Sequence, residues 1–194
     1  MIEVAKDRIE DLFLSFNQFS FTADGCQLIY NLARQLLAEN PGWTCVAGDE
    51  SSAFQLALRP EMRRQLMEHF PEFIPYFSAA YDTAAGLYYE DEPLPEEQCQ
   101  NGCQQGCSLG TFLHGLAQLT RTRTLIANNP DCVFLLLCDD VFILGPPEAV
   151  ALAVARAFGE YKEQVETANG HAEIWQSCNI HEIWRLHCSN GVVR

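Results

Sequence analysis

The sequence predicts an α+β fold in which helices pack on one face of a small antiparallel sheet. Stretches with apolar residues at helical spacing alternate with short apolar runs. Two of those runs, 132–138 and 141–145, flank the adjacent residues Asp139 and Asp140, which is typical of a β-hairpin. The chain has 194 residues, 48% hydrophobic and 20% charged, enough for one domain with a substantial core.

The first half of the chain is predicted to be helices around one strand. Leu28, Leu32 and Leu36 recur every four residues, and Pro60 and Pro71 each open an apolar-periodic stretch. A strand is predicted over 43–48 and ends at Asp49. The predicted helices cover 3–16, 26–40, 60–70 and 71–82.

The second half continues with a short strand at 86–89 and an acidic, proline-containing loop at 90–102. Residues 108–129 are apolar enough to form a helix despite two glycines. After the hairpin comes the strongest helix prediction, 146–170, with prolines at its start, an acid in its first turn and a glycine at its end. We expect one domain over 1–170, and 171–194 as a separate terminal segment with a weak strand.

Asp139 and Asp140 lie between apolar runs, where two adjacent carboxylates repel each other. A divalent cation removes that repulsion. Polymerases and nucleases hold two Mg²⁺ ions between carboxylates to activate an attacking oxygen and stabilise the leaving one. Such a site needs a third carboxylate from a neighbouring strand end, and Asp49 is the candidate. A plain hairpin turn at Asp139 and Asp140, or a capping role for Asp49, is the alternative.

Three motifs occur in an order that resembles the palm of reverse transcriptases, notably those of retroelements without long terminal repeats, over roughly residues 17–170. They are GDESSAFQ (48–55), NGCQQGCSLGTFLHGLA (101–117) and LCDDVFILG (137–145). The connecting segments FPEFIPYFSAAY (70–81) and GPPEAV (145–150) are also similar to this family.

The resemblance implies a polymerase-palm-like fold and a role for each motif. Asp49, Asp139 and Asp140 would be the catalytic metal ligands for Mg²⁺. Phe54 would lie under the incoming sugar as a gate against a 2′-hydroxyl, although alone it reads as a core aromatic. Gln105 and Gly106 would shape the pocket for template and nucleotide.

Departures from the family pattern bear on activity. Ser52 and Gln55 stand where the family has asparagines, Ser108 where proline is common, and Leu137 where an aromatic precedes the aspartates. Residues 1–40 would be a remnant of the fingers, with only Lys6 and Arg8 near the start as cations. Residues 171–194 lack the lysine that the family uses.

We therefore expect a retroelement-derived palm that serves as a non-polymerising structural or interaction subunit of a larger protein or ribonucleoprotein assembly, its aspartates a relic of a magnesium site. The alternative is an RNA-directed DNA polymerase palm completed by other chains.

Charge and cysteine content bear on partners and compartment. The net charge of −14 disfavours nucleic acid as the main partner and favours other protein subunits. The longest apolar run, 133–138, is too short for a membrane span. Nine cysteines, several in apolar runs, indicate reduced thiols in an intracellular compartment, and the start of the chain reads as neither signal nor transit peptide.

Other candidate sites are weaker. Zinc ligands occur as Cys178, His181, His187 and Cys188, but the spacing is unusual and the nearby aromatics also suit packing or a partner-binding segment. Cys99, Cys103 and Cys107 recur every four residues, which could mark a thiol-metal site. His114 lies in an apolar stretch and is expected to be a core histidine. A Cys–His nucleophile would need a third orienting group.

Overall fold

The computed structural model describes residues 2–49, 53–82, 88–89, 92–93, 101–104, 106–157 and 183–184. The chain forms two compact units. We call Lys6–Ser51 with Arg121–Arg194 the sheet unit, and Met1–Ala5 with Ser52–Thr120 the helical unit. Helix α6 (Gly110–Ala127) belongs to the helical unit up to Thr120 and to the sheet unit from Arg121.

The sheet unit contains a four-stranded sheet in the order β4-β5-β1-β6. All its strand pairs are antiparallel. The strands are β4 (Val133–Leu137), β5 (Asp140–Gly145), β1 (Thr44–Asp49) and β6 (Ile183–Trp184). The predicted hairpin is confirmed, but its two turn residues are Cys138 and Asp139, because Asp140 already pairs with Leu137. Asp49 likewise lies within β1 as its last residue.

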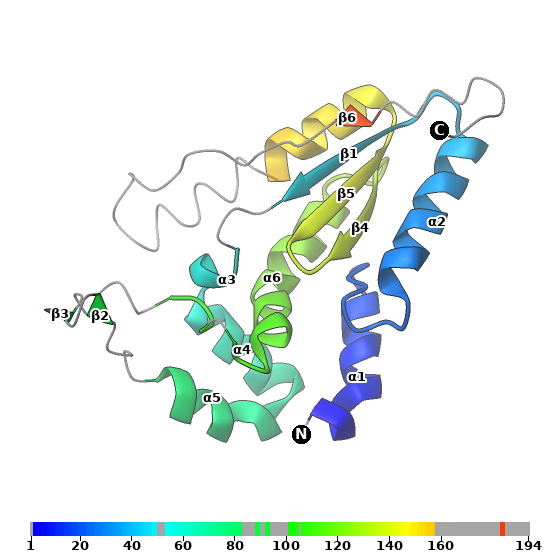
Figure 1. Cartoon of the computed structure of the whole chain (residues 1–194). Helices are drawn as coiled ribbons and strands as arrows, with labels where there is room; N and C mark the ends of the chain where they lie inside the picture. The colour runs from blue at the N-terminus through cyan, green and yellow to red at the C-terminus, as the bar shows by residue number, and fades with distance from the viewer. Residues whose placement is uncertain are drawn as a thin grey trace. The chain divides into compact units, whose positions relative to one another are not determined.

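Both faces of this sheet are covered by helices of the same unit (Figure 1). On one face, Phe134 and Ile143 pack with Leu125 of α6 and with Val150 of a helix described over 147–157. On the other face, α2 (Gly25–Glu39) packs through residues such as Ile29. The α+β class is confirmed, whereas our expectation of helices on one face omitted α2.

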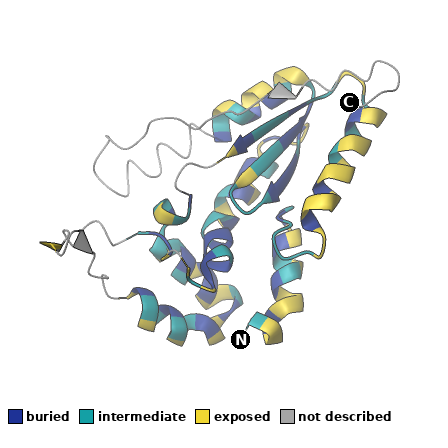
Figure 2. Cartoon of the chain, viewed as in Figure 1, coloured by how far each residue is buried: buried dark blue, intermediate teal, exposed yellow. Residues whose placement is uncertain are grey.

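Burial along α2 follows this packing: the side toward the strands is buried and the outer side is exposed (Figure 2).

The N-terminal segment completes the unit. Phe13, on α1 (Ile2–Leu14), packs its ring against Phe16 and Phe21 at centroid distances of 5.4 and 4.8 Å. Gln18 then forms a parallel bridge with Leu136, so the segment extends the edge of β4.

The helical unit consists of short helices around an aromatic core. They are α3 (Ala53–Leu56), α4 (Arg59–His69), the 3-10 turn η1 (Pro71–Phe73), α5 (Ile74–Tyr81) and the first part of α6. Phe70, Phe73 and Phe112 are buried and meet in edge-on or tilted contacts, with ring centroids 5.2–6.2 Å apart. Such contacts add to the free energy of burial.

Several predicted bounds change. The short helix α3 was not predicted. Strand β2 (Tyr88–Tyr89) lies within the strand predicted at 86–89, and its partner β3 (Glu92–Pro93) lies inside the expected loop. The predicted helix 146–170 is observed over 147–157, and its remainder lies outside the described residues. Within the described part of the chain, every helix is too short or too polar to cross a membrane.

Candidate functional site

The predicted carboxylates lie at one end of the sheet. The turn between β4 and β5 holds Asp139 and delivers Asp140 to the first position of β5. Asp140 is the cross-strand partner of Asp49, the last pair of the β1–β5 ladder. Directly opposed residues in an antiparallel pair have Cβ atoms about 4.5–5.5 Å apart, so the side chains of Asp49 and Asp140 leave the backbone close to each other.

The three carboxylates interact electrostatically. Partial burial raises the pKa of Asp140, and the charges of Asp139 and Asp49 raise it further. By its accessible surface Asp140 remains exposed, so water screens part of this repulsion. The site therefore concentrates negative charge that a proton or a cation would relieve.

The turn that carries these acids is conformationally restrained. Cys138 has φ 55°, the left-handed region that L-residues with a side chain rarely adopt. The Gln18 amide holds it from both sides: its Nε2 donates to the Cys138 carbonyl at 3.1 Å and its Oε1 accepts from the Cys138 amide at 3.0 Å. The Ser20 hydroxyl accepts from the same amide at 2.6 Å. Gln18 is 1% exposed, so its side chain is shielded from water, whereas Ser20 and Cys138 are half-buried.

The sequence predictions did not include Gln18 or Ser20. Their contact partner is about 120 residues away, and the segment NQFS has no periodicity that would indicate pairing with β4. The burial of the Gln18 side chain and its hydrogen bonds to Cys138 are therefore seen only in the structure.

The donor set fits Mg²⁺ in chemical type, because carboxylate oxygens are the ligands this ion prefers. The structure brings Asp49 and Asp140 into register, but the described residues contain no group of three His, Cys, Asp or Glu side chains close enough to hold an ion. The metal role of Asp49, Asp139 and Asp140 stays a prediction.

The predicted nucleotide-contacting residues belong to the helical unit. The ring of Phe54 stacks on His114 with centroids 4.6 Å apart and planes at 23°. His114 is 1% exposed, as expected for a core histidine, and its Nε2 lies 3.1 Å from the Gln118 amide nitrogen. Phe54 therefore takes part in packing within its own unit. Gln105 lies outside the described residues.

The loop of the second motif is fixed by glycines and by α3. Gly106 is exposed and has φ 82°. Gly102 has φ 76°, and its amide donates to the Ala57 carbonyl at 2.8 Å. A Cβ at Gly102 would lie 2.3 Å from the Gln55 carbonyl oxygen, so only glycine fits there.

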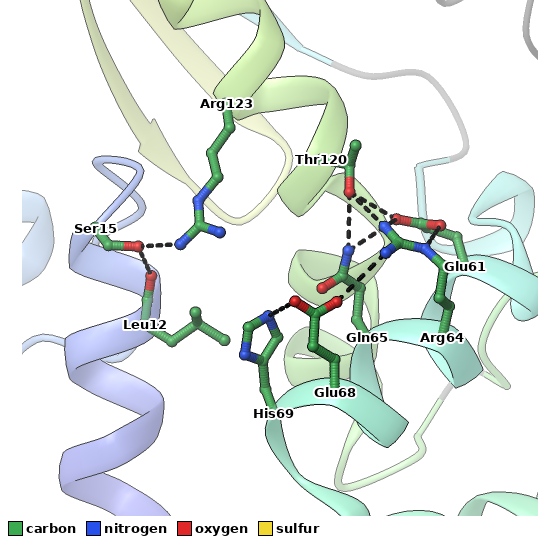
Figure 3. Close-up of polar contacts among 9 residues, drawn as sticks. All are labelled: Leu12, Ser15, Glu61, Arg64, Gln65, Glu68, His69, Thr120 and Arg123. Atoms are coloured by element: carbon green, nitrogen blue, oxygen red, sulfur yellow. Dashed lines mark hydrogen bonds and ion pairs between the residues drawn. The ribbon is translucent and has the colours of Figure 1, made fainter.

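Five arginines, at positions 59, 63, 64, 121 and 123, each bond to an oxygen of their own unit. In the helical unit, Arg64 donates to Glu61 at 2.6 Å, and Glu61 also accepts from Gln65 and Thr120 (Figure 3). These contacts and the charge of Arg64 outweigh burial and lower the pKa of Glu61. The other partners are Gly102 for Arg59, Asp82 for Arg63, Ala157 for Arg121 and Ser15 for Arg123.

The remaining sequence candidates divide by location. Cys99, Cys178, His181, His187 and Cys188 lie outside the described residues, so no geometry bears on a zinc site. Cys103 and Cys107 are free thiols in the helical unit.

The fold and the site define an α+β protein with an acidic hairpin at one end of a small antiparallel sheet. No family model and none of the curated proteins matches the chain. Among solved structures it is similar to telomerase, a reverse-transcriptase-related polymerase. An apo telomerase from Candida tropicalis, truncated from the C-terminal domain, gives a TM-score of 0.52 at 12% identity, covering 84% of this chain and 36% of that one.

Telomerase from Candida albicans, solved with a TWJ fragment of telomeric RNA, gives a TM-score of 0.51 at 13% identity, covering 80% of this chain and 32% of that one. The chain thus spans about a third of the length of these structures. At this identity the likeness shows the fold alone.

Proposed function

We propose that this chain is a reverse-transcriptase-like palm that acts as a structural or interaction subunit of a larger protein or ribonucleoprotein assembly and does not itself polymerise nucleotides. The likeness to telomerase supports the fold on which the proposal rests.

The observation that carries this proposal is the outer side of α2. Ile29, Leu36 and Leu37 already pack on the sheet, yet Leu28 and Leu32 are 39% and 37% exposed. At 100° per residue, the apolar positions from Leu28 to Leu37 span about 180° of the helix surface. A helix that covers one sheet needs a narrower apolar stripe. The apolar surface that Leu28 and Leu32 leave exposed suits contact with another protein.

The charge distribution supports a protein partner over nucleic acid. The chain carries a net charge of −14, and five of its arginines bond to oxygens of their own unit. A phosphate backbone would have to compete with these partners. The stacked position of Phe54 on His114 also suits a packing role better than a gate for nucleotides.

A catalytic palm completed by other chains is the second candidate. The observation that favours it is the pairing of Asp49 with Asp140 beside Asp139, because the charges of Asp49 and Asp139 raise the pKa of Asp140 and a divalent cation would relieve that repulsion. In that case these residues would hold Mg²⁺, and the ion would supply charge stabilisation to a transferring phosphoryl group.

Two experiments distinguish the candidates. Purified full chain, alone and with its co-purified partners, is tested for primer extension with Mg²⁺. We expect none; extension that disappears in Asp139→Asn would overturn the non-polymerising proposal in favour of the catalytic one.

The second experiment tests the α2 surface. The double variant Leu28→Glu/Leu32→Glu should lose stoichiometric partners that the wild type retains, with an unchanged circular dichroism spectrum. Gln27→Glu/Asn31→Glu adds the same two charges at the same spacing on the polar side of α2 and should retain them. Equal retention by both variants would rule out this surface as the interface.

A further inference from the structure

The loop that leads into α6 brings two cysteines and two tyrosines together within the helical unit. A Cβ placed on Gly110 would lie 3.9 Å from the Cβ of Cys107 and 4.0 Å from that of Cys103, so both side chains start close to one point. The Tyr76 hydroxyl lies 3.4 Å from the Cys107 sulfur. The hydroxyl of Tyr81 accepts from the Gln104 amide at 3.4 Å, in the same loop.

The surroundings of Cys107 favour its thiolate. Partial burial raises the pKa of Cys107, but hydrogen bonds from the tyrosine hydroxyls and from the amides of Leu109 and Gly110 outweigh it, so the pKa is lowered. Both residues lie at the N-terminal end of α6, where the helix dipole favours negative charge. Cys107 is also partly exposed, so small reagents can reach it.

The tyrosines are suited to remain donors. The hydrogen bond to Cys107, then burial, raises the pKa of Tyr76. Burial, followed by its contact with Cys107, raises that of Tyr81. Both hydroxyls therefore stay protonated at neutral pH, and that of Tyr76 lies within hydrogen-bond distance of the Cys107 sulfur.

Cys103 is the complementary thiol. It is 6% exposed, and its sulfur lies 3.7 Å from the Gly110 carbonyl oxygen and 3.9 Å from the Met62 sulfur. Burial, and then the charge of Cys107, raise the pKa of Cys103 to about 12. Cys103 therefore stays a thiol while Cys107 is charged. Once Cys107 becomes neutral, its charge no longer raises the pKa of Cys103.

We propose that Cys107 and Cys103 form a redox-sensitive pair, in which a hydroperoxide oxidises Cys107 and Cys103 then captures it in an intrachain disulfide. This inference does not depend on the proposed function.

The two steps balance. The Cys107 thiolate attacks the peroxide, the O–O bond breaks, and with one proton the products are a sulfenic acid and water or an alcohol. Cys103 then loses its proton as its sulfur bonds to Cys107, the S–O bond breaks, and the hydroxyl leaves as water. The loop must close for this second step, because a disulfide needs Cβ atoms about 4 Å apart.

The consequence falls on the second sequence motif. Gln105 and Gly106 lie between the two cysteines, and Cys103 is anchored through its amide to the Phe54 carbonyl at 2.8 Å. A disulfide would therefore restrict the segment to which the resemblance to reverse transcriptases assigns contact with template and nucleotide.

The test uses the full chain, reduced, and treated with equimolar hydrogen peroxide at pH 7. Peptide mass spectrometry should find a Cys103–Cys107 disulfide, as a loss of two hydrogens, while the exposed control Cys26 stays alkylatable. Cys103→Ser should leave a sulfenic acid on Cys107 that dimedone labels. Cys107→Ser should give neither product.

A second measurement covers the case in which a cysteine variant does not fold. In otherwise intact protein, Tyr76→Phe removes one donor to Cys107, so iodoacetamide should modify Cys107 at least about twofold more slowly at pH 7. The midpoint of its rate–pH profile should move up, and that of Cys26 should not. Equal midpoints for Cys107 and Cys26 in the wild type, or a dimedone-labelled Cys26 beside an unlabelled Cys107 in Cys103→Ser, would overturn the proposal.

Discussion

Replacing Gln18 by Met tests whether the buried amide clamp holds the aspartate turn. Met has similar length and no polar atoms that could replace the amide. The change removes both hydrogen bonds to Cys138, at 3.1 and 3.0 Å, and the one that Gln18 accepts from the Ser20 hydroxyl at 2.6 Å. The Cys138 amide retains its bond to Ser20, whereas the Cys138 carbonyl loses the Gln18 donor.

The expected loss follows from these contacts. A hydrogen bond contributes about 0.5–1.5 kcal/mol net, and a buried acceptor left unpaired costs about 1–3 kcal/mol. The extra apolar surface of Met offsets part of this, so we expect Gln18→Met to lower the free energy of unfolding by about 2–3 kcal/mol. Cys138 would also lose the contacts that offset its left-handed backbone.

Urea unfolding followed by circular dichroism measures the effect, and hydrogen exchange reports the Cys138 amide directly. Gln27→Met is the matched control, because Gln27 is exposed and bonds only within α2, to Asn31; it should change stability by less than about 0.5 kcal/mol. If Gln18→Met behaves like this control and exchange at Cys138 is unchanged, the clamp does not stabilise the turn.

Three further predictions concern single sites. Gly102→Ala should destabilise the chain by about 2 kcal/mol or more in urea unfolding, because of its positive φ and the nearby carbonyl, whereas Gly42→Ala, with open space around it, should be close to neutral. Asp140→Asn should stabilise the fold at pH 7 and not at pH 3: its raised pKa means that ionisation disfavours the folded state as pH rises, and thermal melts at both values that show the same difference would refute this. Glu61→Gln should destabilise by about 1 kcal/mol at pH 7 and lose its effect as pH falls below the usual Glu range, since a lowered pKa contributes stability only while the group is ionised; an unchanged effect at pH 3 would contradict it.

The hairpin and the alignment of Asp49 with Asp140 could be predicted from sequence. Two apolar runs around a two-residue turn specify a hairpin, and polar residues at the ends of adjacent strands tend to meet. The second face of the sheet was also foreseeable: β4 reads VFLLL, and a strand without polar alternation indicates burial on both sides.

The clamp by Gln18 and the cluster around Cys107 could not be predicted in the same way. Gln18 meets a turn about 120 residues away, and Tyr76 meets Cys107, which lies 31 residues later in the sequence. Neither contact has a periodic signature. Helix α3 is only four residues long, which is too short for apolar spacing to reveal.

The order of strands also has a consequence for biosynthesis. β1 lies in the middle of the sheet, but its partner β5 begins about 90 residues later in the chain. At about 5–20 residues per second, a ribosome would take roughly 5–18 s to deliver that partner. During this interval β1 has no partner strand on either edge, and residues 52–120 of the helical unit are synthesised before β5. Slowing translation after Asp49 should therefore increase the chaperone dependence of the nascent chain more than slowing it after Gly145.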